Sequence, residues 1–240
     1  MNRLDKELHL RKMTKSRTAA AELISSGKVA VNGVVCVKLS QEVTPDDEIN
    51  IIGEALPLKY VSRGGLKLEH ALRTFDIDLS GKLCLDVGAS TGGFTDCMLK
   101  HGAHSVYAVD VGTSQLAAEL RQDERVISME NCDIRTAKFP VKFDFTAVDV
   151  SFISLKLILP FIKNEAVVLI KPQFELGKRH KGVITDKKVQ AQIAADITAF
   201  AKETGFEVKG ITDSPAMSKA GSGEKNREFL MWVTKKEVCS

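Results

Sequence analysis

Hydrophobic positions in the first 52 residues pass from a helical spacing to a strand spacing, which predicts helices followed by strands. Leu4, Leu8 and Leu10 indicate a short first helix. A second helix is expected from Ser16, a typical N-cap residue, to Gly27, a typical stop. We therefore expect a small α+β module at the start of the chain.

The strand part of this module has a clear hairpin signal. In Val29–Cys36, β-branched residues flank Asn32 and Gly33, the pair that a type I′ turn favours. Pro45–Asp47 then predicts a second turn, which leads into a last strand over Glu48–Ile52.

After a linker over residues 53–62, apolar strands alternate with helical segments. This alternation is typical of a mostly parallel sheet covered by helices, so we expect an α/β fold with a Rossmann-like sheet over residues 63–240. Only the loop over Pro215–Gly223 separates the last two strands, which should therefore pair antiparallel. The expected strands are 82–87, 104–110, 125–129, 143–150, 166–171, 206–211 and 227–234.

The turn after the first of these strands is the most informative stretch of the chain. A run of small residues from Gly88 to Gly93 follows the strand, and such glycines let backbone N–H groups approach a ligand closely. The run lacks the Gly-x-Gly-x-x-Gly spacing of dinucleotide enzymes, and Asp86 at the strand end would repel a pyrophosphate. A carboxylate there suits a cationic amino-acid ligand, which favours S-adenosylmethionine (SAM).

Carboxylates also end later strands of the predicted sheet. Asp110 is placed for the ribose hydroxyls of SAM, and Asp133 is placed to accept a hydrogen bond from the adenine amino group. Any one of these aspartates alone has a second interpretation as a helix cap or turn residue, but the set indicates a cofactor site. The candidate cofactor-binding residues are Asp86, Gly88, Ala89, Ser90, Gly92, Gly93, Phe94, Asp110, Val111, Asp133, Ile134 and Asp149.

Charge distinguishes the first module from the rest. The net charge of the chain is only +3, but residues 1–40 hold eight lysines and arginines against three acids. This excess is typical of a surface that binds a polyanion, although a solvated helix face gives the same counts.

Cysteine usage and hydropathy indicate the cellular compartment of the protein. The five cysteines are scattered and form no Cys-x-x-Cys pair, so we expect neither a disulfide framework nor a metal site. The N-terminus lacks the apolar core of a signal peptide, and the longest apolar stretch, 143–162, contains three charged residues. We expect a cytoplasmic protein without stable membrane association.

The residues at the end of the fourth strand limit the kinds of methyl acceptor that the protein can use. Val148–Phe152 contains no proline, unlike the Asn/Asp-Pro-Pro-Tyr/Phe motif common in amino-group methyltransferases. Cytosine C5 methylation requires a cysteine nucleophile, and none occurs between Cys132 and Cys239. Four charged residues instead fall on the helix before the first strand and at ends of the fourth, fifth and last strands: Lys67, Asp149, Lys171 and Glu228.

This order of charged residues resembles the Lys-Asp-Lys-Glu tetrad of FtsJ-type RNA ribose 2′-O-methyltransferases. The resemblance implies Lys171 as the base for a ribose hydroxyl, with Lys67 as a cationic neighbour, because a lysine serves as a base only when its pKa is lowered. It also implies that Asp149 orients Lys171 and that Glu228 holds Lys67 or the substrate ribose. The alternatives without a catalytic role are that Lys171 is an ordinary solvated lysine and that Glu228 is an ordinary exposed strand residue.

Two longer resemblances cover most of the chain. Residues 2–50 resemble the RNA-binding domain first seen in ribosomal small-subunit protein four, and the whole chain resembles the TlyA family, which joins this domain to an FtsJ-like domain. The motifs that carry the wider resemblance are RLDKEL, VAVNG, YVSRGGLKLEHAL, LCLDVGASTGGFTDCML, VYAVDVG, DVSFISL, LIKPQFELGK, GVITD and EFLMWV.

The TlyA resemblance implies methylation of cytidine 2′-hydroxyls in ribosomal RNA (rRNA) within a ribosomal subunit, and the family also has a haemolysin label. The short ends of this chain resemble members that act on 23S rather than 16S rRNA. A non-catalytic ribosome-assembly factor and a membrane-lytic protein are the alternatives. The residues expected nearest RNA phosphates are Arg3, Arg11, Lys12, Lys15, Ser16, Arg17, Lys28 and Arg63.

Two of these expectations have a second interpretation. Arg63, in the Ser62–Gly65 segment, either contacts RNA phosphates or simply begins the helix that carries Lys67. Phe174 either stacks on a flipped base or is an ordinary core residue.

Overall fold

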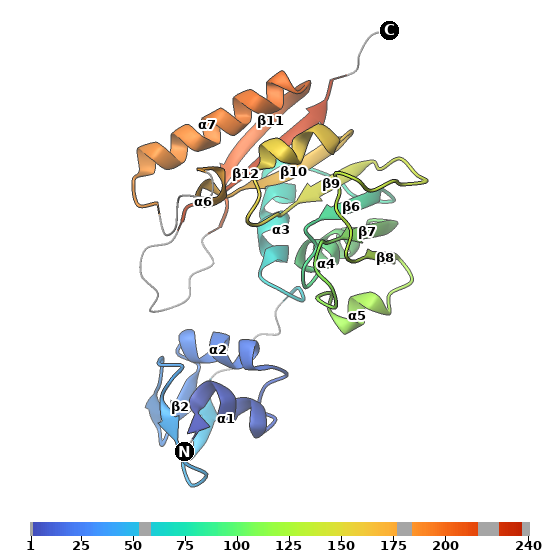
Figure 1. Cartoon of the computed structure of the whole chain (residues 1–240). Coiled ribbons are helices and arrows are strands. Elements are labelled where there is room, and N and C mark those ends of the chain that lie inside the picture. Colours follow the sequence, from blue (N-terminus) through green and yellow to red (C-terminus); the bar gives the residue numbers. More distant parts are fainter. Residues whose placement is uncertain (1, 53–58, 177–183, 216–225, 237–240) are drawn as a thin grey trace. The chain divides into compact units, whose positions relative to one another are not determined.

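The computed structural model describes residues 2–52, 59–176, 184–215 and 226–236. It contains two compact units, which divide between Leu58 and Lys59 and are described separately below (Figure 1). Residues 59–62 belong to the larger unit, because Tyr60 is only 1% exposed and its ring fills the space beside Gly65.

The smaller unit has the helices and the hairpin that its sequence predicts. The Ser16 hydroxyl accepts the N–H of Ala19 at 3.1 Å and so begins α2, and Asn32 and Gly33 have the positive φ values of a type I′ turn. Two short strands, β1 and β4, were not expected, and they pair antiparallel. The elements are β1 (Asn2–Arg3), α1 (Leu4–Leu10), α2 (Arg17–Ser25), β2 (Val29–Val31), β3 (Val34–Val35), β4 (Glu42–Val43) and β5 (Ile49–Ile51).

The larger unit is built on a seven-stranded sheet with the order β11-β12-β10-β9-β6-β7-β8. The five strands β10, β9, β6, β7 and β8 are parallel neighbours. As the sequence predicts, β11 and β12 pair antiparallel, and β12 also pairs antiparallel with β10. The strands are β6 (Leu83–Val87), β7 (Ser105–Val109), β8 (Val126–Met129), β9 (Phe145–Val148), β10 (Glu165–Ile170), β11 (Phe206–Asp213) and β12 (Phe229–Lys235).

Helices cover both faces of this sheet (Figure 1). Leu68, Met98 and Leu120, from α3, α4 and α5, pack on one face, whereas Leu159 and Ile197, from η2 and α7, pack on the other. The helices are α3 (Gly64–Phe75), α4 (Gly93–Lys100), α5 (Ala118–Arg121), the 3-10 helices η1 (Leu155–Leu157) and η2 (Leu159–Phe161), α6 (Pro172–Glu175) and α7 (Lys187–Glu203). In such a sheet, ligands bind beyond the carboxyl ends of the parallel strands.

Candidate active site

The glycine-rich turn after β6 is shaped by close backbone approach. Gly88 has φ +86°, and a Cβ there would lie 2.5 Å from the carbonyl oxygen of Asp149, the residue that follows β9. Gly92 has φ +95°, and a Cβ there would lie 2.2 Å from Leu120 Cδ1. Glycine is therefore required at both positions, because a side chain would be strained and would collide with its neighbours.

Asp86 is a fully buried carboxyl group at the end of β6. Thr95 Oγ1 donates a hydrogen bond to Asp86 Oδ2 at 2.6 Å, whereas Oδ1 has no donor among the described residues. Burial raises the pKa of Asp86 to about 7, and the negative charges of Asp149 and Asp110 act in the same direction. A buried acceptor without a donor fits the ammonium group of an amino-acid ligand such as SAM.

Asp110 holds two turns at the end of β7. Its Oδ2 accepts the backbone N–H of Ser90 at 2.7 Å, and its Oδ1 accepts that of Gly112 at 2.7 Å. Each carboxylate oxygen retains a second lone pair, so this residue can still accept hydrogen bonds from ribose hydroxyls.

A cavity of about 500 Å³ lies along these strand ends. Of the expected cofactor residues, seven line it: Gly88, Ser90, Asp110, Val111, Asp133, Ile134 and Asp149. Five do not: Asp86, Ala89, Gly92, Gly93 and Phe94. Phe94 is 3% exposed and belongs to the core, so it supports the turn and does not face the cavity.

Several lining residues were missed by the sequence analysis. Gln115 supports the glycine-rich turn, because its Oε1 accepts a hydrogen bond from the Ser90 hydroxyl at 3.1 Å. Arg135 binds Asp133 through both carboxylate oxygens and holds the pKa of that carboxyl below its usual range. The remaining lining residues that were missed are Val87, Val109, Cys132, Val150, Ser151, Phe152, Ile153 and Ile158. Val87 and Val109 end β6 and β7, whereas Cys132 and residues 150–153 lie outside helices and strands, where no local sequence signal fixes the backbone.

The four residues of the expected tetrad form two ion pairs. Lys171 Nζ lies 2.5 Å from Asp149 Oδ1, and Lys67 Nζ lies 2.5 Å from Glu228 Oε2. All four side chains are between 11% and 21% exposed, so both pairs are largely shielded from water.

Strand register brings the two pairs to the same edge of the sheet. Ile170 pairs with Phe229 at the last rung between β10 and β12. Lys171 and Glu228 are therefore the next residues on adjacent strands. Asp149 follows β9, which borders β10 on its other side. Residues distant in the sequence thus meet at one edge of the sheet, where Asp149 lines the cavity and Lys67, Lys171 and Glu228 do not.

Two aromatic rings adjoin the Lys171–Asp149 pair. The ring centroids of Phe152 and Phe174 are 4.9 Å apart, and Lys171 Nζ lies 5.8 Å from the Phe174 centroid. Phe152 is 91% exposed and has φ +65°, a conformation that is strained for a bulky residue. Lys171 Nζ also donates to the Ser151 hydroxyl at 2.9 Å. Phe174 is half-buried and so is not an ordinary core residue.

In the smaller unit, some of the expected RNA-binding arginines neutralise buried acids. Arg17 and Arg3 bind the two oxygens of Asp5 at 2.7 and 3.0 Å. Burial opposes ionisation of Asp5, but these two arginines outweigh it and hold the pKa of Asp5 below its usual range. About half of each arginine side chain is exposed, so both remain accessible to a ligand.

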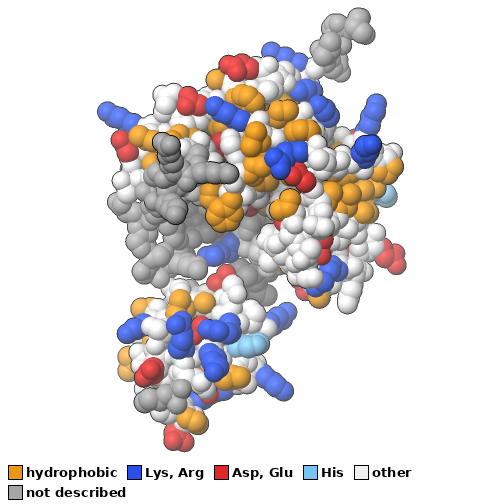
Figure 2. All heavy atoms as spheres, in the orientation of Figure 1, with side chains coloured by type: hydrophobic (Ala, Val, Ile, Leu, Met, Phe, Trp, Pro, Cys, Tyr) orange, Lys and Arg blue, Asp and Glu red, His pale blue; other side chains and the backbone are white. Residues whose placement is uncertain are grey.

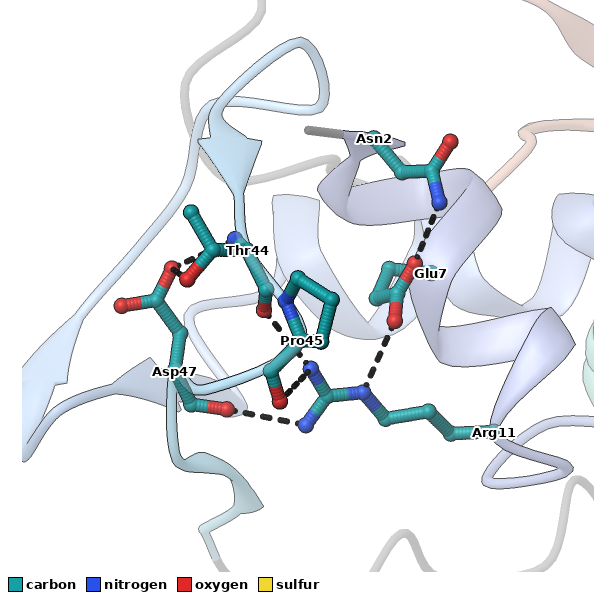
Figure 3. Close-up of polar contacts among 6 residues, drawn as sticks. All are labelled: Asn2, Glu7, Arg11, Thr44, Pro45 and Asp47. Atoms are coloured by element: carbon teal, nitrogen blue, oxygen red, sulfur yellow. Dashed lines mark hydrogen bonds and ion pairs between the residues drawn. The ribbon is translucent and has the colours of Figure 1, made fainter.

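Arg11 is turned into the smaller unit (Figure 3). Its Nε donates to Glu7 Oε1 at 3.0 Å, and its Nη atoms donate to the carbonyl oxygens of Thr44, Pro45 and Asp47 at 2.8–3.1 Å. These bonds join the end of α1 to the turn between β4 and β5. Arg11 therefore has a structural role that its basic character did not indicate.

The other basic candidates are more accessible. Lys12, Lys15 and Ser16 are exposed and Lys28 is half-buried, and Lys and Arg side chains gather on the face of the smaller unit in Figure 2. Arg63 lies in the larger unit, at the N-cap position of α3.

The described residues show neither a metal centre nor a membrane span. Those residues contain no cluster of three or more His, Cys, Asp or Glu side chains that could hold a metal ion. Within the same part of the chain, no helix has the length and apolar character needed to cross a bilayer.

Comparisons with known proteins agree with this architecture. The S4 domain model matches residues 2–49, and the FtsJ-like methyltransferase model matches residues 60–235. A Bacillus subtilis protein, YqxC, provisionally named an rRNA methyltransferase, is 42% identical over 95% of this chain and 84% of its own length. The "16S/23S rRNA (cytidine-2'-O)-methyltransferase TlyA" of Mycobacterium tuberculosis is 37% identical over 96% of this chain and 89% of its own.

A solved structure gives the same result. A Streptococcus thermophilus protein provisionally described as a hemolysin is 40% identical, covers 98% of this chain and 89% of its own, and has a TM-score of 0.74. The sequence and structural matches both extend across the two units. This chain belongs to the TlyA family, in which an S4 domain precedes an FtsJ-like methyltransferase domain.

Proposed function

We propose that this protein is a SAM-dependent methyltransferase that modifies the ribose 2′-hydroxyl of a cytidine in ribosomal RNA. The observation that carries the proposal is that the Lys171–Asp149 and Lys67–Glu228 pairs lie at one edge of the sheet, where Asp149 also lines the cavity. The rRNA (cytidine-2'-O)-methyltransferase name of the Mycobacterium tuberculosis relative supports the choice of substrate.

The residues present fit SAM as the methyl donor. When bound, SAM supplies a methyl group activated by its sulfonium. Asp86 would balance its ammonium charge, Asp110 would bind its ribose hydroxyls, and Asp133 would accept from its adenine amino group. The buried Asp86 Oδ1 without a donor and the free lone pairs of Asp110 support this assignment.

The tetrad residues would prepare the ribose hydroxyl. Lys171 Nζ takes the hydroxyl proton, and Asp149 and Ser151 fix the direction of its N–H bonds. Glu228 holds the Lys67 ammonium at the same edge of the sheet. Because the oxygen must attack in line, the orientation of these groups matters as much as their basicity.

The aromatic pair of exposed Phe152 and half-buried Phe174 supports a nucleic-acid substrate. Phe152 and Phe174 present flat apolar surface beside Lys171, and a base that has left its stack can pack on such a surface. The exposed lysines of the smaller unit would bind phosphates and hold the RNA without reading its sequence.

The decisive experiment measures methyl transfer from labelled SAM to ribosomal subunits from cells that lack this protein. We expect labelling of a cytidine ribose, in 23S rRNA ahead of 16S, and assays with separate large and small subunits distinguish the two. Lys171→Ala should reduce transfer about 100-fold or more while SAM still binds. The matched control is Lys163→Ala, which removes an exposed lysine before β10 and should leave transfer unchanged.

A non-catalytic assembly factor is the second candidate, because the smaller unit has a core of its own that includes Leu4, Leu8 and Ile24. Complementation separates the two functions. If Lys171→Ala restores ribosome assembly fully in cells that lack the protein, binding is sufficient. If that variant also transfers methyl groups at the normal rate, Lys171 is not the base.

A further inference from the structure

Two segments at the carboxyl edge of the sheet carry Asp149 and Lys171, one of the two ion pairs of the tetrad. The loop 149–154 follows β9, and the segment 171–175 follows β10. The near ends of these loops meet where Lys171 contacts Asp149 and Ser151. The aromatic pair described above is also formed by one residue from each loop.

Glu175 joins the far ends of the same two loops. Its Oε2 accepts the hydroxyl of Ser154 at 2.5 Å, and its Oε1 accepts the backbone N–H of Leu155 at 2.9 Å. The Ser154 hydroxyl in turn accepts the N–H of Lys156 at 3.1 Å and so caps η1. One carboxylate therefore fixes both the start of η1 and the end of α6.

Glu175 is partly buried, so its carboxylate would be unfavourable there without these hydrogen bonds. Burial raises the pKa of Glu175, and the hydrogen bonds from Leu155 and Ser154 oppose that effect. A partly buried carboxylate is maintained only when donors satisfy it, and both donors here come from the loop after β9. Glu175 is not among the residues that line the cavity.

Phe152 shows why the loop after β9 needs such support. Its left-handed backbone costs of order 1–3 kcal/mol and persists only when neighbouring structure holds it. Its ring is 91% exposed, so burial of the ring supplies little of that support. The bonds to Glu175 begin two residues later, at Ser154.

We propose that Glu175 is a positioning residue for methyl transfer, which holds the loop 149–154 against the segment 171–175 so that Lys171 meets Asp149 and Phe152 meets Phe174. The proposal rests on the proposed function for its kinetic consequence. Glu175 acts through the two loops and does not touch the reacting atoms.

The test compares Glu175→Ala with the conservative variant Glu175→Gln. The glutamine side chain can still accept from Leu155 and can donate to Ser154, so it should keep kcat within about threefold of the wild-type value. Alanine removes both bonds and should lower kcat roughly 100-fold, because a misplacement of about 1 Å has that effect. The KM for the ribosomal substrate should change less than about threefold, since loss of positioning in the transition state appears in kcat.

The matched control is Glu165→Ala, at the opposite end of β10. Glu165 also accepts two hydrogen bonds, from Lys82 and Trp232, so its loss should destabilise the fold while kcat stays near the wild-type value. Equal losses of kcat in the two alanine variants at equal losses of thermal stability would overturn the proposal. A wild-type kcat in Glu175→Ala would also overturn it.

Amide hydrogen exchange tests the link between the two loops without a measurement of methyl transfer. Glu175→Ala should speed amide exchange in residues 149–155 and 171–176, whereas Glu165→Ala should not. If the wild-type protein transfers no methyl group but these segments respond as expected, the proposed function fails and the structural link stands. Unchanged exchange in Glu175→Ala would reject the link itself.

Discussion

Asp86 shows, at the scale of a single residue, how burial makes stability depend on pH. Burial raises its pKa to about 7 in the folded protein, whereas an aspartate in an unfolded chain titrates near 4. The folded state therefore keeps its proton at pH values where the unfolded state has lost it. The resulting stabilisation is fully present below about pH 4 and is lost as pH rises towards about 7.

Asp86→Asn should remove this dependence, because the amide stays neutral. The free energy of unfolding of the variant relative to wild type should rise by up to roughly 1.4 kcal/mol per pH unit between pH 4 and 7. Urea unfolding at several pH values measures it. Asp144→Asn, just before the neighbouring strand β9, is the control and should leave the wild-type dependence in place. Parallel curves for Asp86→Asn and wild type would contradict the expectation.

Asp86 should also couple SAM binding to proton release. A cation beside the carboxylate favours its ionised form, so binding at pH 6 should expel a proton that burial retained. Isothermal titration calorimetry in two buffers with different ionisation enthalpies counts the protons released. Asp86→Asn should release fewer than wild type. An equal number from both proteins would show that Asp86 does not respond to the ligand.

Arg11 acts at the scale of secondary-structure elements, because it joins α1 to the turn between β4 and β5. Arg11→Ala leaves the carbonyl oxygens of Thr44, Pro45 and Asp47 without this donor and should destabilise the smaller unit by roughly 1–3 kcal/mol. Thermal unfolding followed by circular dichroism measures the loss. Lys15→Ala, an exposed change of similar charge, should leave the midpoint unchanged. A stable Arg11→Ala protein with weakened RNA binding would instead restore Arg11 as a phosphate contact.

Elements whose signals are local could be predicted from the sequence. The N-cap at Ser16 and the turn at Asn32 and Gly33 depend on neighbouring residues alone, and all appear as expected. The strands β1 and β4 have two residues each and exist only because they pair across the fold, so no pattern marks them. The tetrad could be named by resemblance, but its convergence depends on strand register.

Loop geometry accounts for most of what the sequence did not predict in the candidate site. Phe152 has a positive φ although it is neither glycine nor asparagine, so the sequence does not indicate this conformation. The loop that contains it is held by Glu175, which lies in a separate segment. Arg11 and Lys12 are adjacent and equally basic, yet only Arg11 turns inward to the carbonyl groups of a distant turn. Charge alone therefore predicts a basic surface but not which of its members are committed to the fold.

At the scale of the whole molecule, the two units should act on one RNA through different kinetic constants. Lys12 and Lys15 are exposed in the smaller unit, and contacts of this kind strengthen substrate and transition state equally. Lys12→Ala combined with Lys15→Ala should therefore raise the KM for the ribosomal substrate, with kcat and SAM affinity unchanged. Each lost phosphate contact should also reduce the salt dependence of RNA binding by roughly 0.7–0.9 in the slope of log K against log salt.

The matched control replaces two exposed lysines of the larger unit, Lys138 and Lys142, with alanine. That variant loses the same net charge, so a general charge effect would raise KM equally in both. Filter binding and initial rates over a range of salt concentrations separate the outcomes. A fall in kcat for the Lys12 and Lys15 variant, at unchanged KM, would mean that the smaller unit orients the RNA for reaction. Division of labour between binding and chemistry requires the opposite result, because phosphate contacts that only hold the substrate cannot lower its barrier.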